Sequence, residues 1–173
     1  SQNSNNPCVD GNTASHVADS LHSGMIQAHS SSKLITLSQA SQYLSEFAVF
    51  ALCYAAYNGS AGDSTWRDSY TRFGASRLES ITSLSVVHKH FGQMGHYDQL
   101  PVVYAGTLGN SNWLSLVDQA LNSSRPWQNS TQASLRADTL HSGPNQAAIG
   151  TQNVWLDTAN LDTNKIFAVC YTH

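Results

Sequence analysis

Short apolar runs, separated by clusters of Gly, Asn, Ser and Asp, set the pattern of this chain. The strongest is FAVFALCYAAY at residues 47–57, which is apolar at both alternating sets of positions and is followed by Asn-Gly-Ser. Such a run is typical of a strand buried on both faces or of a buried helix. Its aromatic residues and the Asn-Gly-Ser stop favour a strand.

Similar runs recur about every 8–12 residues, which is the spacing of all-β sandwiches. They lie at 25–29, 33–37, 65–73, 80–91, 100–108, 112–121, 153–158 and 166–172. Residues 25–29 and 33–37 fit a hairpin or two edge strands, and 114–121 also fits a short helix. No segment sustains a 3.6-residue period, so the pattern predicts an all-β sandwich.

The chain contains an internal repeat. PCVDGNTASHVADSLHSG from Pro7 matches PWQNSTQASLRADTLHSG from Pro126 at nine of 18 positions without a gap, 119 residues apart. FALCY at 50–54 then recurs as FAVCY at 167–171. The shared order predicts one complete β-sandwich repeat over 1–125 and a partial second repeat over 126–173, which stops at less than half the repeat length.

The repeated Leu-His-Ser-Gly draws attention to His22 and His141. A recurring Asp, His and Ser set suggests a hydrolase triad. A catalytic site is seldom made twice, however, whereas a turn that closes a repeat must be. We therefore expect Gly24 and Gly143 to supply a positive φ, the preceding serines to cap the turn, and each His to bond to backbone.

Three cysteines, an odd number, lie at Cys8, Cys53 and Cys170. Cys53 and Cys170 are equivalent in the two copies, and Trp127 takes the place of Cys8 in the second. The simplest pairing is Cys8–Cys53, which leaves Cys170 unpaired or available for an intermolecular bond.

Trp66 lies 13 residues after Cys53, with a turn between them. This step resembles the Cys-to-Trp step of immunoglobulin-like sandwiches, in which the Trp packs on a core disulfide. The second Cys of that family is absent, since the Tyr-x-Cys position reads LPVVYAG here. The resemblance implies an immunoglobulin-like β-sandwich and covers strand number, spacing and one Trp.

Composition points to an extracellular or cell-surface protein. Charged residues make up 11% of the chain, against roughly 25% in ordinary soluble domains. Three sequons, at Asn58, Asn122 and Asn129, predict N-linked glycans. The opening SQNSNNPC lacks a charged and apolar leader, as expected of a mature start. A net charge of −3 argues against nucleic acid, and no apolar run is long enough to span a membrane.

HKHFGQMGH at 88–96 is the best metal candidate. On a strand, His88 and His90 point to one face, and His96 could follow from a loop as a third ligand. Two histidines on the solvated face of an edge strand explain the pattern equally well, and only Asp98 nearby could orient a ligand. We expect no metal and no cofactor.

Two further alternatives rest on residue type alone. An acid pair for glycoside hydrolysis could come from Glu46, Asp63, Asp68 and Glu79, although no spacing singles out a pair and Asp68 is expected to pair with a neighbouring Arg. Four Trp and seven Tyr residues could form a carbohydrate-stacking surface, but large aromatics are more often core.

The incomplete second copy raises a problem of assembly. Strands at 153–158 and 166–172 should leave open edges and an apolar face unless they are completed by another segment or chain. We expect copies to join head to tail into a homopolymer by strand complementation. The expected contact residues are Val154, Trp155, Ile166, Phe167, Val169 and Tyr171. The leading interpretation is thus a non-enzymatic, extracellular, filament-forming structural protein. The alternatives are a secreted carbohydrate-binding or adhesion module and a metal-dependent or glycoside hydrolase.

Overall fold

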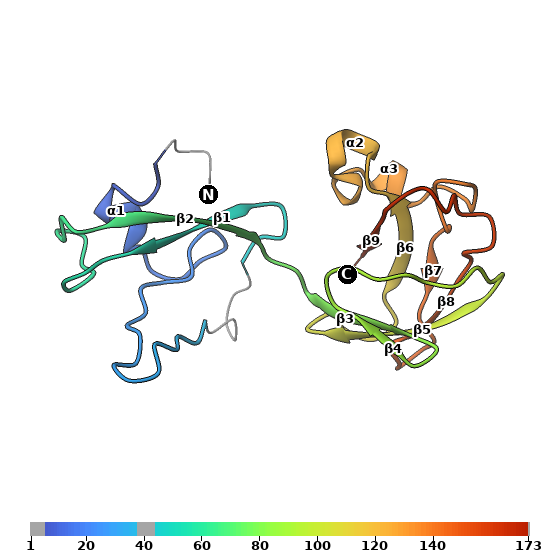
Figure 1. The fold of residues 1–173 in the computed structure, drawn as a ribbon, viewed down its shortest axis with the longest axis horizontal. Coiled ribbons are helices and arrows are strands. Elements are labelled where there is room, and N and C mark those ends of the chain that lie inside the picture. Colours follow the sequence, from blue (N-terminus) through green and yellow to red (C-terminus); the bar gives the residue numbers. More distant parts are fainter. Residues whose placement is uncertain (1–5, 38–43, 173) are drawn as a thin grey trace. The chain divides into compact units, whose positions relative to one another are not determined.

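The computed structural model describes residues 6–37 and 44–172, and the chain divides into two compact units (Figure 1). Unit 1 spans Ser1–Ser76 and unit 2 spans Arg77–His173. Regular structure is mostly antiparallel strand with a few short helices, which confirms the all-β prediction. The units divide at 76/77 and not at the repeat boundary of 125/126, because strands on the two sides of residue 125 pair with each other.

Unit 1 is built on one antiparallel pair, β1 (Val49–Tyr54) and β2 (Arg67–Gly74). A single-turn helix, α1 (Gly11–Ala14), precedes them and is capped by Asp10, whose side chain accepts from the N–H of Asn12. The expected disulfide is present: Cys8 and Cys53 are joined, with their Cα atoms 5.2 Å apart. The bond fastens the segment before α1 to the C-terminal end of β1.

Residues 25–29 and 33–37, expected as strands, have no strand structure. A turn joins them, in which His29 donates to the carbonyl of Leu34 and Lys33 donates to that of His29. The hairpin turn forms, but the two arms do not pair any further.

Unit 2 holds two antiparallel sheets (Figure 1). The first has the order β4-β3-β5-β8, made of β3 (Leu78–Ser83), β4 (Val86–His88), β5 (Leu100–Gly106) and β8 (Asn153–Leu156). The second has the order β7-β6-β9, made of β6 (Trp113–Asp118), β7 (Asn145–Gln146) and β9 (Phe167–Tyr171). Short helices follow β6: α2 (Leu121–Ser124), η1 (Pro126–Gln128) and α3 (Ser130–Ala133).

The main core lies between these sheets. It consists of Ile81, Leu100, Val102, Tyr104, Leu108, Leu114, Leu116, Ala147, Val154, Leu156 and Leu161. Residues 114–118, expected as strand or helix, form strand β6, and all five are buried. Leu114 and Leu116 lie on one face, in the core, and Ser115 lies on the other face, where its hydroxyl donates to the Ala133 carbonyl of α3, so both faces of this strand are covered and it shows no polar alternation.

The pairing of β8 and β9 crosses the expected domain boundary. Leu156 of β8 lies opposite Leu100 of β5, and Val169 of β9 lies opposite Leu116 of β6. Residues 126–172 are thus completed by residues 100–118 of the same chain. Among the described residues, no helix is long and apolar enough to cross a membrane.

The turn after β1 contains a buried carboxylate that predicts an acid sensitivity of unit 1. Asp63 accepts the backbone N–H groups of Asn58, Gly59 and Thr65. The Thr65 hydroxyl also donates to it, and these bonds, with that hydroxyl first, lower the pKa of Asp63 to about 2. A carboxylate whose folded pKa is depressed contributes stability that is present above its ordinary pKa and lost as the pH falls through the folded value.

We therefore expect unit 1 to lose stability between about pH 4 and pH 2, and Asp63→Asn to remove this part of the pH dependence. Denaturant unfolding across that range would measure it, with Asp162→Asn in unit 2 as the control. An unchanged slope in Asp63→Asn would contradict the assignment.

Candidate functional site

The two copies of the repeated sequence adopt the same local structure. α1 and α3 are equivalent single turns, with Asp10 and Asn129 as equivalent caps. Asp19 and Asp138 each accept the backbone N–H two residues ahead, at 2.7 Å in both copies. The match extends past the glycine, since Gln27-Ala28 repeats as Gln146-Ala147 and Leu37 as Leu156 at the same spacing.

The Leu-His-Ser-Gly turn is structural in both copies. Gly24 has φ +78° and Gly143 has φ +74°, as expected, and a Cβ at Gly143 would meet the backbone N of Ala137 at 3.2 Å. The His rings differ from expectation. They bond to the acidic residue of the same turn, His22 Nδ1 to Asp19 Oδ1 at 2.8 Å and its equivalent pair at 2.9 Å.

His16 lies beside the first of these pairs. Among the described residues, His16, Asp19 and His22 form the one group of at least three metal-ligand types whose ligand atoms lie within 4.8 Å of one another. The second copy keeps the Asp-His pair and has Leu135 in place of His16. The recurring pair is therefore accounted for by the turn it holds.

The two turns differ in what lies against them. In unit 2, β6 runs beside the turn: Ser142 donates its N–H to the carbonyl of Leu116 at 2.9 Å, and Leu116 donates its N–H to the Ser142 hydroxyl at 2.8 Å. The N–H of Asp118 also donates to the carbonyl of Leu140. The other edge of β6 pairs with β9. β6 thus fills the space between the repeated turn and the repeated FAVCY strand.

Unit 1 has the same turn and the same FALCY strand, and none of its described residues forms a strand between them. Within the described part of the chain, β1 pairs with β2 alone. A groove of about 960 Å³ in unit 1 is lined by residues 21–28 of this turn and the segment after it and by residues 50–59 of β1 and the turn that follows, together with side chains from neighbouring segments such as Ile35, Leu37 and Phe73. The groove of unit 1 therefore occupies the position that β6 occupies in unit 2.

Apolar residues that are buried in unit 2 are exposed at the equivalent positions of unit 1. Ile35 is 40% exposed against 1% for Val154, and Leu37 is 38% exposed against 0% for Leu156. Val154 and Leu156 belong to β8, which pairs with β5. Residues 33–37 form no strand because no strand among residues 6–37 and 44–76 lies beside them as β5 lies beside β8.

No protein family, curated protein or solved structure matches this chain. The assignment of a site rests therefore on the comparison of its own two copies. The two copies differ at the groove of unit 1, and this groove is therefore the candidate functional site.

The expected assembly residues lie elsewhere, in unit 2, where their strands are already paired. Val154 lies opposite Val102 of β5. On β9, Phe167, Val169 and Tyr171 face β6 partners. Trp155 and Ile166 remain 55% and 52% exposed. Along one edge each, β8 and β9 pair with strands of the same chain; among the described strands each is also an outer strand of its sheet, as β1 is in unit 1.

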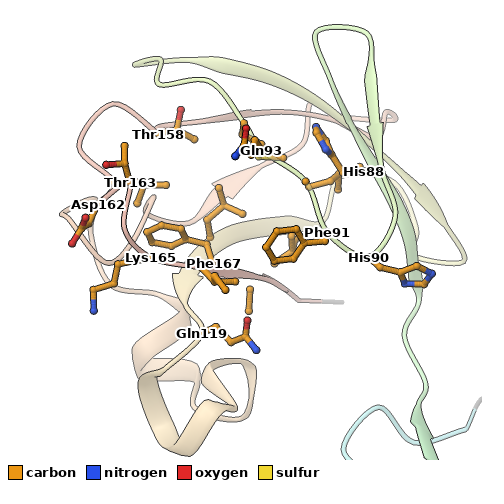
Figure 2. Close-up of a pocket in the computed structure, with 18 of the residues that line it drawn as sticks. His88, His90, Phe91, Gln93, Gln119, Thr158, Asp162, Thr163, Lys165 and Phe167 are labelled. Atoms are coloured by element: carbon orange, nitrogen blue, oxygen red, sulfur yellow. The ribbon is translucent and has the colours of Figure 1, made fainter.

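The histidines expected to bind a metal are separated. β4 ends at His88, so the strand alternation that was to place His90 on the same face does not continue. The buried His88 ring bonds through Nε2 to the Ser83 hydroxyl at 2.9 Å. Figure 2 shows the rings of His88 and His90 pointing in different directions. His88, His90 and His96 are not among the described groups with metal-ligand spacing.

These histidines border a pocket of about 760 Å³ within unit 2. Phe91 and Phe167 face it together with amide and hydroxyl side chains, among them Gln93, Gln119 and Thr158 (Figure 2). The pocket therefore combines two aromatic rings with neutral hydrogen-bonding groups. No sequence pattern indicates this pocket, because its walls come from residues 78–81, 88–96, 116–119, 127 and 158–169, which lie far apart in the chain.

The remaining candidates are Asp68, the unpaired cysteine and the asparagines of the three sequons. Asp68 forms an ion pair with Arg72, as expected. Cys170 is free and 2% exposed, and burial raises the pKa of its thiol to about 11, which disfavours an intermolecular disulfide in this conformation. Of the sequon residues, Asn58 and Asn122 are exposed, and the Asn122 amide donates to the Arg125 carbonyl, whereas Asn129 is half-buried and caps α3.

The two copies give a matched pair of substitutions. Ser142→Ala removes the acceptor of the buried Leu116 N–H, so we expect unit 2 to lose about 1–3 kcal/mol of unfolding free energy. Ser23→Ala removes only a hydroxyl that donates to its neighbour's carbonyl, and we expect a loss of about 0.5 kcal/mol or less. Urea unfolding of both variants tests this; equal losses would contradict the difference between the two sites.

Proposed function

We propose that this chain is an extracellular structural protein whose β-sandwich units assemble end to end by strand complementation. The observation that carries the proposal is the groove of unit 1, because the equivalent space in unit 2 is filled by β6. Main-chain hydrogen bonds along an open strand edge give affinity in this mode of recognition. The exposed Ile35 and Leu37 supply apolar surface to be covered.

Three features support the extracellular setting. The Cys8–Cys53 disulfide persists in oxidising compartments. The exposed sequon at Asn58 is accessible for a glycan. The 11% charged composition leaves a surface of neutral hydroxyls and amides. The immunoglobulin-like character of the sandwich belongs to the same proposal, with Trp66 buried in unit 1 after Cys53.

Assembly can be tested by displaying a free strand on the chain. A flexible linker followed by a second copy of residues 110–121 would be added after residue 173. We expect oligomers whose mass by light scattering grows with protein concentration, because intermolecular insertion depends on concentration and self-insertion does not. The matched control carries Asp at both core-facing Leu positions of the added strand. An extended chain that stays monomeric at all concentrations would refute assembly.

A second candidate, small-carbohydrate binding, is favoured by the pocket of unit 2. Phe91 is 75% exposed at its rim, next to the amide of Gln93. Exposed aromatic faces beside neutral hydrogen-bonding groups suit sugar rings. A glycan array with the chain and with Phe91→Ala would test it; identical signals from both proteins would reject the pocket as a binding site.

A further inference from the structure

β6 forms backbone hydrogen bonds along both edges, with β9 on one side and with the Leu140–Ser142 turn on the other. Unit 1 contains residues equivalent to both of these partners. Towards β9, Gln119 donates to the carbonyl of Ile166 at 2.8 Å and Thr172 donates to that of Trp113 at 3.0 Å. In an antiparallel ladder such pairs alternate along the strand. Residues 168 and 170, which lie between them, therefore also direct their backbone groups to β6.

The equivalent residues of β1 are Ala51 and Cys53. The alternate residues of β1 direct their backbone groups to β2 instead. Ala56, just past the strand, belongs to this alternate set, and its N–H donates to the Thr65 hydroxyl. Ala51 and Cys53 thus present their N–H and C=O groups to the groove. Across the groove, Ser23 and Leu21 hold the positions from which Ser142 and Leu140 bond to β6.

The character of the occupant follows from β6. The chain has two copies of the turn and the FALCY-type strand, and among the described strands β6 alone fills such a space, in unit 2. The groove of unit 1 would therefore take a strand from outside the described residues.

We propose that the groove of unit 1 binds one extended polypeptide segment of the β6 type, antiparallel to β1 and between β1 and the Leu21–Ser23 turn. This deepens the proposed function and rests on it only for its biological setting. The register follows from β6 and β9, where Leu114 lies opposite Tyr171, Leu116 opposite Val169 and Asp118 opposite Phe167.

The incoming strand accordingly places its Leu114-type residue opposite Tyr54 and its Leu116-type residue opposite Leu52. Leu114 and Leu116 are 1% and 4% exposed in unit 2, so the groove selects apolar residues at these two positions. The acid at position 118 is not selected in the same way. Asp118 pairs with Lys165 at 2.9 Å, and the residue equivalent to Lys165 in unit 1 is Ala48.

The direct test uses a fluorescent synthetic peptide of residues 110–121, added to the full chain. We expect saturable binding at one peptide per chain, and hydrogen exchange at Ala51 and Cys53 slowed by about tenfold or more at saturation. The same peptide with Asp at both Leu positions is the matched control. Ser23→Ala should weaken binding about 5- to 10-fold because the strand's N–H loses its acceptor.

A second experiment attaches the strand covalently to the chain, because a short free peptide can fail to stay extended. A copy of residues 77–119 placed directly before Ser1 reproduces the order of unit 2, because Asn3-Ser4 matches Asn122-Ser123. We expect the same protection at Ala51 and Cys53, and none when the added copy carries the two Asp substitutions. Unprotected β1 amides in both arrangements would overturn the inference.

The two proposals fail separately. The chain could bind the peptide and yet stay monomeric when it displays a free strand at its C-terminus. That result would support the β6-type occupant and refute assembly. Oligomers that form equally with the wild-type and the Asp-substituted strand refute the β6-type occupant and leave assembly in place.

Discussion

Replacing Cys8 and Cys53 with serine is expected to unfold unit 1 while unit 2 stays folded. The disulfide closes a loop with a sequence separation of 45 residues, for which the chain-entropy model gives about 4 kcal/mol. Unit 1 has one two-stranded sheet and exposes several of its apolar side chains, so it has little other stabilisation to draw on. Hydrogen exchange resolved along the chain would show fast exchange over residues 44–74.

The control for this experiment is Cys170→Ala. Its thiol is unpaired and buried in unit 2, so any cost should appear in unit 2 and leave the exchange of β1 unchanged. Reduction of the wild-type chain should reproduce the double serine variant. Slow exchange over β1 after both treatments would show that the disulfide is not what holds unit 1 together.

Leu156→Ala is expected to cost unit 2 about 2–5 kcal/mol of unfolding free energy, because its side chain is fully buried between the sheets. Leu37→Ala, the same substitution at the equivalent position, should cost about 1 kcal/mol or less because that side chain is 38% exposed. Denaturant unfolding of the two variants measures the difference.

The same pair also reports on completion of the groove. With the copy of residues 77–119 placed before Ser1, Leu37 acquires the neighbours that Leu156 has in β5. The cost of Leu37→Ala should then rise towards that of Leu156→Ala. Equal costs in the unextended chain would mean that unit 1 already buries this residue, which would remove the basis for an unfilled site.

Several local features could be predicted from the sequence because they depend on neighbours along the chain. The positive φ of Gly24 and Gly143 follows from a turn that recurs with its flanking residues. The Cys8–Cys53 pair follows from the repeat, which left Cys170 opposite Trp127. The hydrogen bond between each His and its Asp was missed, although the constant spacing of Asp and His in both copies was the available signal.

The candidate metal site shows where such local inference fails. Placing His88 and His90 on one face assumed a continuous strand, and β4 ends at His88. Where a strand ends depends on its partner, and the pairing of β3 with β4 reaches only from Ser83–Val86 to Ile81–His88. No pattern within residues 88–96 records that limit.

The sequence by itself determined the all-β class, the repeated turn and the disulfide. Only the tertiary structure decided which strands pair. The repeat placed an unfinished piece after Pro126, but β5 and β6 precede that piece in the chain and pair with its strands β8 and β9 along one edge each. The physical reason is that strand pairing joins residues far apart in sequence, and a repeat marks where a pattern begins without stating which neighbour, before or after it, supplies the hydrogen bonds.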